Sequence, residues 1–72
     1  DIHDRVNFAV RNARTYIDDA CESVTLEMTV DTQYCSVMDY FEIFLGRMLL
    51  CRKAAERLGI TFRLVINGQR LL

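Results

Sequence analysis

The residues best suited to chemistry are Cys35 and Ser36, which stand just before a segment with a helical pattern. A helix N-terminus stabilises negative charge, so a thiol or hydroxyl there could act as a nucleophile. A thiol nucleophile normally needs a base, and His3 is the only histidine. No glycine-rich phosphate loop, HExxH or GxSxG pattern accompanies the pair. The sequence therefore predicts no enzyme, with Cys35 a packed thiol and Ser36 a helix cap.

The three cysteines do not have the spacing of a metal site. Cys21, Cys35 and Cys51 lie 14 and 16 residues apart, and no CxxC pair is present. Structural zinc sites use about four ligands, usually in closely spaced pairs. We expect no metal and no cofactor. Reduced thiols are typical of a cytoplasmic protein.

Composition narrows the class of protein. The 72 residues suit one domain, residues 1–72; 51% are apolar and 26% are charged, which excludes a disordered tail. A net charge of −1 argues against nucleic acid as a partner. The longest apolar run, residues 40–51, contains Glu42 and Arg47, so we expect no membrane span.

Charge is divided unevenly along the chain. Residues 1–42 hold nine acidic and three basic side chains, and residues 43–72 hold six basic and one acidic. Solvated helix faces are one explanation. The other is an anionic partner for the arginines of the second half, Arg47, Arg57, Arg63 and Arg70.

Hydrophobic periodicity predicts the elements that carry these residues. Apolar residues at helical spacing predict an amphipathic helix over residues 2–20. Residues 23–30 alternate between apolar and polar side chains, which predicts a strand with one apolar face. Residues 31–36 connect it to the next element.

A second helix is predicted over residues 37–58. Ser36 and Asp39 have the spacing of a capping box, and Gly59 follows the last apolar position. Gly46 lies inside this helix, where it either costs about 1 kcal/mol of stability or marks a close contact. We expect a close contact with the sheet or with the first helix.

The elements give an α/β fold in the order α-β-α-β. The second strand covers residues 60–66, so strand, helix and strand form a right-handed parallel βαβ unit. Two strands are too few for an independent sheet, so we expect the sheet to be incomplete in this chain. Asn67 and Gly68 form a turn signal, and a short hairpin with residues 70–72 is an alternative ending.

Several short motifs resemble the STAS domain, the sulfate-transporter and anti-sigma-factor-antagonist family. They are Val37-Met38-Asp39, Leu45-Gly46-Arg47, Leu58-Gly59 with the strand 60–66, and Arg70-Leu71-Leu72. The resemblance covers nearly the whole chain but lacks the family's first two strands. It implies that a further helix starts at residues 70–72.

The chain departs from the family pattern after Asp39. Tyr40 and Phe41 stand where the family carries Ser-Ser or Thr-Gly, so the phosphorylatable serine is absent from that position. Thr32 and Ser36 are nearby hydroxyls that the resemblance does not place on the phosphosite. It therefore implies a degenerate STAS-like domain without a phosphorylation switch.

The predicted function is a non-catalytic, regulatory protein-interaction module, similar to an anti-sigma factor antagonist. In open parallel sheets, recognition sites gather where strands end and helices begin. The expected binding surface is the 31–40 loop with the start of the second helix, namely Thr32, Tyr34, Ser36, Asp39 and Tyr40. The resemblance implies an anti-sigma-factor-like kinase or a transporter ATPase as partner.

An alternative interpretation is a structural subunit or fragment of a larger assembly. Such a chain would complete its sheet with an assembly neighbour, including a second copy in a homo-oligomer.

Overall fold

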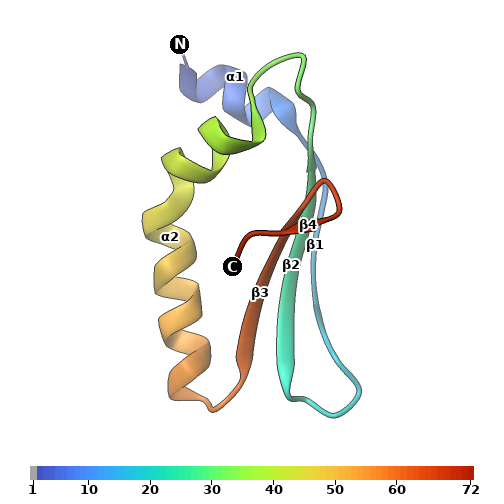
Figure 1. The fold of residues 1–72 in the computed structure, drawn as a ribbon, viewed down its shortest axis with the longest axis vertical. Coiled ribbons are helices and arrows are strands. Elements are labelled where there is room, and N and C mark those ends of the chain that lie inside the picture. Colours follow the sequence, from blue (N-terminus) through green and yellow to red (C-terminus); the bar gives the residue numbers. More distant parts are fainter. Residues whose placement is uncertain (1) are drawn as a thin grey trace.

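The computed structural model describes the backbone of residues 2–72 and the side chains of residues 4–72. Its elements are α1 (Ile2–Ala9), β1 (Val10–Ile17), β2 (Ser23–Val30), α2 (Val37–Arg57), β3 (Thr61–Ile66) and β4 (Gln69–Arg70). The four strands form one mixed sheet in the order β1-β2-β3-β4, with α2 on one face (Figure 1). β2 and β3 are parallel, and the other two pairs are antiparallel.

The central βαβ unit is confirmed. β2 has the predicted bounds, α2 ends one residue earlier than predicted, and β3 begins one residue later. The side chain of Ser36 accepts a hydrogen bond from the Asp39 backbone N–H at 3.0 Å, as an N-cap should. Gly59 follows the helix with a φ of 74°, a left-handed conformation that favours glycine. α2 therefore bridges the parallel pair between two well-defined ends.

The prediction of one helix over residues 2–20 is wrong. The helix ends at Ala9, and β1 follows as an antiparallel partner of β2, from the Val10–Val30 pair to the Ile17–Val24 pair. The register shifts between Arg11 and Arg14, with Asn12 at a φ of 54°. Backbone pairing with a central strand overrides a helical pattern that has few strong helix formers.

The expected α-β-α-β order and incomplete two-strand sheet are corrected as well. The observed order is α-β-β-α-β-β, and the sheet of four strands comes from this chain alone. Antiparallel partners on both sides of the parallel pair supply the missing strands.

The chain ends in a hairpin rather than in a helix that starts at residues 70–72. Asn67 and Gly68 have φ angles of 52° and 79°, the left-handed pair that a tight two-residue turn requires. The Asn67 side-chain amide accepts from the N–H of Val30 at 2.8 Å and donates to its carbonyl at 3.1 Å. These bonds attach the hairpin turn to the end of β2.

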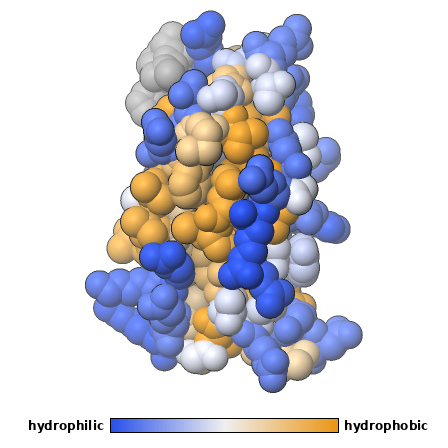
Figure 2. Space-filling model, in the orientation of Figure 1, coloured by the Kyte–Doolittle hydropathy of each residue, from blue (hydrophilic) through white to orange (hydrophobic). Residues whose placement is uncertain are grey.

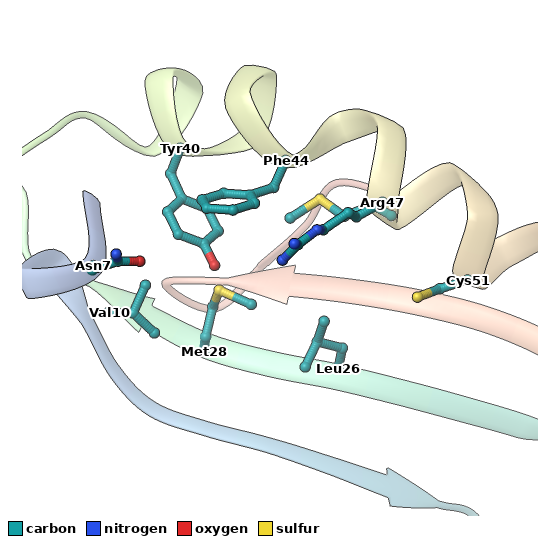
Figure 3. A pocket seen from close by; sticks show the side chains of 9 residues that line it. Asn7, Val10, Leu26, Met28, Tyr40, Phe44, Arg47 and Cys51 are labelled. Atoms are coloured by element: carbon teal, nitrogen blue, oxygen red, sulfur yellow. The ribbon is translucent and has the colours of Figure 1, made fainter. Parts of the chain in front are cut away.

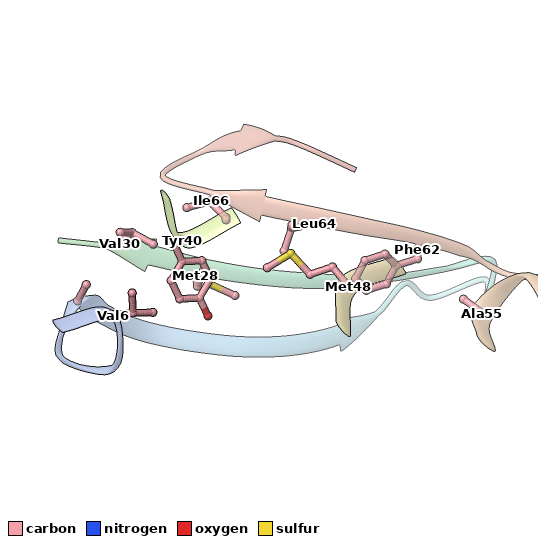
Figure 4. Packing of buried hydrophobic residues seen from close by; sticks show 10 residues of the cluster. Val6, Met28, Val30, Tyr40, Met48, Ala55, Phe62, Leu64 and Ile66 are labelled. Carbon is pink, nitrogen blue, oxygen red and sulfur yellow. The ribbon is translucent and has the colours of Figure 1, made fainter. Parts of the chain in front are cut away.

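The core lies between α2, α1 and one face of the sheet (Figure 4). Its buried residues are Val6, Ala9, Met28, Val30, Tyr40, Met48, Ala55, Phe62, Leu64 and Ile66. The expected close contact at Gly46 is wrong, because this residue is exposed and a Cβ added there would meet no atom within 4 Å. Gly46 lies on the outer face of α2.

Burial is unequal across the sheet. In β3, Phe62, Leu64 and Ile66 are buried, whereas every residue of β1 after Val10 is exposed. α2 therefore covers the β3 side of the sheet and leaves much of the β1 side open.

Candidate functional site

The loop between β2 and α2 lies beside α1 at one end of the molecule (Figure 1). The Asp31 N–H donates to the carbonyl of Ala9 at 2.8 Å, which ties the loop to the end of α1. The Asp31 side-chain carboxylate accepts a hydrogen bond from the N–H of Gln33 at 3.0 Å. The backbone carbonyl of Asp31 accepts one from the N–H of Tyr34 at 3.0 Å. Asp31 thus organises a local turn that holds Tyr34 in place.

Four of the five predicted surface residues are exposed. Thr32, Tyr34, Ser36 and Asp39 face solvent, and 41% of Tyr34 is accessible. The Ser36 hydroxyl caps α2, so its role in the structure is local.

Tyr40 does not belong to this surface. It is only 9% exposed, and its ring centroid lies 4.8 Å from that of Phe44. Burial raises the pKa of its hydroxyl, with a smaller contribution from Cys35. The predicted exposure is wrong because Tyr40, Phe44 and Met48 are spaced by four residues and share the inner face of the helix. That spacing is visible in the sequence.

Phe8, rather than the expected Tyr40, is the second exposed aromatic residue beside Tyr34 on this surface. Phe8 is 66% exposed, its ring centroid lies 6.4 Å from that of Tyr34, and the planes are tilted by 30°. The Arg11 guanidinium lies 5.9 Å from the Tyr34 ring centroid, and Arg11 also donates to the carbonyl of Phe8. Met38, in the first turn of α2, adds a side chain that is 53% exposed. We call Phe8, Arg11, Thr32, Tyr34 and Met38 the end surface.

The sequence did not indicate Phe8. Over a continuous helix its position falls outside the predicted apolar stripe, so nothing joined it to the 31–36 loop. The contact arises because α1 stops at Ala9 and its last turn lies against the loop.

Cys35 has the properties of a packed thiol. It is half-buried and free, and burial raises its pKa, with a further increase from the charge of Asp39. A thiol catalyst needs the opposite shift. His3, the only candidate base, lies outside the residues whose side chains are described.

A second feature is an apolar groove along α2 above β1 and β2. It has two adjacent parts, of about 400 Å³ and 330 Å³, which share Leu26 and Cys51 in their linings. In the first part, Tyr40, Phe44 and Arg47 point from α2 toward Met28 and Leu26 of β2 (Figure 3). The Arg47 guanidinium lies 5.9 Å from the Phe44 ring centroid. The second part is bounded by Ile17, Leu58 and other apolar side chains.

Two kinds of site are absent from the part of the chain that the structure describes. Among the side chains of residues 4–72, no group of three His, Cys, Asp or Glu residues could hold a metal ion. None of the helices in residues 2–72 is long and apolar enough to cross a membrane. Comparisons of the chain with protein-family models, curated proteins and solved structures return no match. What the chain binds is therefore inferred from its own surfaces.

Proposed function

We propose that the chain is a non-catalytic protein-interaction module that binds a partner protein through the end surface. The observation that carries the proposal is the exposed Phe8–Tyr34 pair with Arg11 against the Tyr34 ring. Aromatic and arginine side chains dominate the binding energy of protein interfaces. Exposed rings on ordered backbone, here the last turn of α1 and the loop after β2, lose little conformational entropy when they bind.

The loop geometry supports a preformed site. Asp31 bonds the loop to α1 and to its own turn, and Ser36 fixes the start of α2. Rings held in this way need no large rearrangement before they meet a partner, which lowers the cost of association.

The finer proposal is a STAS-like regulatory module whose partner is an anti-sigma-factor-like kinase or a transporter ATPase. The resemblance of the motif that ends at Asp39 and the parallel βαβ unit support it. The terminal hairpin departs from the helix that the resemblance implies at residues 70–72. Tyr40 is buried and Ser36 is a cap, so we propose binding without a phosphorylation switch.

The experiment compares three immobilised proteins: the wild type, the double variant Phe8→Ala/Tyr34→Ala, and the control Tyr16→Ala. Tyr16 is 44% exposed and lies in β1, outside the end surface, with the Arg14 guanidinium 5.2 Å from its ring centroid. Proteins retained from a cell extract by the wild type and the control, but lost with the double variant, are purified and titrated by calorimetry.

We expect the double variant to weaken the affinity by about 100-fold, as loss of interface hot spots does. Circular dichroism should stay unchanged, because both rings are largely exposed. Equal binding by all three proteins would remove the end surface from the proposal. Tyr40 is unsuitable for this test because its substitution would disturb the core.

A structural subunit of an assembly is the second candidate, and the apolar groove is the observation that favours it. Completion of the sheet at its edge has less support. β1 carries Arg11, Arg14 and a register shift, features that discourage strand addition, and β4 has only two residues. A neighbouring chain would therefore cover a face rather than extend the sheet.

A further inference from the structure

The groove along α2 is an exposed apolar strip. Its two parts share Leu26 and Cys51 in their linings, so it follows the helix over most of its length. Ile17 and Leu58 are 60% and 77% exposed at its C-terminal part. On the opposite side of the molecule, which carries β3 and β4, Figure 2 shows a further band of apolar side chains with polar side chains at its margins. An exposed apolar strip such as the groove marks an interaction face.

The outer face of α2 is itself apolar or small in its middle. Leu50 is 68% exposed, Ala54 is exposed, and Gly46 has open space where a Cβ would stand. These positions are spaced by four residues and therefore share one side of the helix. A glycine there lets another surface approach the backbone closely.

Charge distinguishes the two ends of this helix face. Asp39 and Glu42 lie near its N-terminus, and Lys53 and Arg57 lie near its C-terminus, all exposed. The β1–β2 turn, where the groove ends beside Ile17, carries exposed Asp18, Asp19 and Glu22 (Figure 1). A helix lying in the groove parallel to α2 puts basic side chains beside this acidic turn. An antiparallel helix would instead bring Asp39 and Glu42 toward it.

We propose that the groove is occupied by α2 of a second copy of this chain. A two-fold axis parallel to the helices places each α2 above β1 and β2 of the other copy. Two parallel helices then form a layer between two sheets. The contact is isologous, so each basic helix end meets the other copy's acidic turn at two equivalent places. The uneven charge of residues 1–42 and 43–72 then serves self-association.

The first experiment measures the oligomeric state of the full chain by sedimentation equilibrium. We expect a dimer at tens of micromolar that weakens as salt rises, because exposed charges are screened. Leu50→Glu should weaken it by at least about 10-fold, since a charge would enter the apolar interface. Phe8→Ala/Tyr34→Ala should dimerise like the wild type, which separates this surface from the end surface.

The second experiment exchanges charges. Asp19→Lys/Glu22→Lys and Lys53→Glu/Arg57→Glu should each weaken the dimer by about 10-fold, and an equimolar mixture of the two should form a mixed dimer. All four residues are exposed, so the fold should be unaffected.

In a Cys21→Ser/Cys35→Ser background, a short bis-maleimide should join Cys51 of one copy to Cys51 of the other. A monomer at hundreds of micromolar, a dimer unaffected by Leu50→Glu, or no recovery in the mixture would overturn the proposal.

Discussion

The two strands that flank β2 differ in burial, although both pair with it along most of their length. β3 buries Phe62, Leu64 and Ile66, while β1 is exposed from Arg11 to Ile17. Hydrogen bonding to a central strand and burial are therefore separate properties. The helix layer decides burial, because α2 packs over β3 and leaves the groove above β1.

The largest effect should come from truncating the buried strand. Leu64→Ala should lower the free energy of unfolding by about 3 kcal/mol, because Leu64 is fully buried and its loss leaves a cavity. Ile17→Ala, on β1, should cost less than about 1 kcal/mol at low micromolar concentration, because Ile17 is 60% exposed. Urea denaturation of both variants measures the difference.

If the two variants lose similar amounts of unfolding free energy, β1 and β3 do not differ in burial as described. Repeating the measurement at several protein concentrations tests the difference further. If a second copy covers the groove, Ile17→Ala should become more costly as the protein concentration rises, because dimerisation stabilises the folded state. Leu64→Ala serves as the control whose cost arises within one copy.

The same difference explains which elements could be predicted from the sequence. Apolar and polar residues alternate along β2 in the sequence, β3 buries Phe62, Leu64 and Ile66 on the side that meets the helix, and α2 carries a cap and a terminal glycine. β1 has no buried face after Val10, so no period-two pattern marks it as a strand. Its conformation depends on pairing with β2, a long-range contact that local periodicity does not contain.

The candidate site was predicted in part for a related reason. The loop and the α2 cap follow from local signals, so Thr32, Tyr34, Ser36 and Asp39 were placed correctly at the surface. Phe8 was missed because its neighbour in space is 26 residues away in the chain and depends on where α1 ends. Tyr40 was misplaced because it was assigned to the binding surface at the start of the helix, although its spacing from Phe44 and Met48 puts it on the inner face.

The next effect concerns the two faces of α2. Gly46→Ala should raise the free energy of unfolding by about 1 kcal/mol, because alanine favours the helix and nothing opposes its Cβ. Ala55→Gly, on the buried inner face, is the matched control and should lower stability. Thermal unfolding at low protein concentration measures both. A fall in melting temperature for Gly46→Ala would mean that the outer face is packed within one copy.

The smallest effect should come from the turn that joins β1 to β2. The Asp18 carboxylate accepts hydrogen bonds from the N–H groups of Glu22 at 2.7 Å and Ser23 at 3.2 Å. The Glu22 bond is the main cause that holds the Asp18 pKa below its usual value of 3.8. A depressed pKa means that the folded chain binds the proton less tightly than the unfolded chain. Its contribution to stability is therefore present above pH 3.8 and is lost as the pH falls through the lower, folded pKa.

Asp18→Asn keeps an oxygen acceptor in the turn but removes the charge. We expect the wild type to be slightly more stable at neutral pH, and the two proteins to converge as the pH falls below 3.8. Urea midpoints measured between neutral and strongly acidic pH give both curves, with Asp19→Asn as the control for charge alone. Parallel curves for the Asp18 variant and the wild type would contradict the expectation. Convergence would show that β1, which gains little from burial, is held in part by the geometry of its turn.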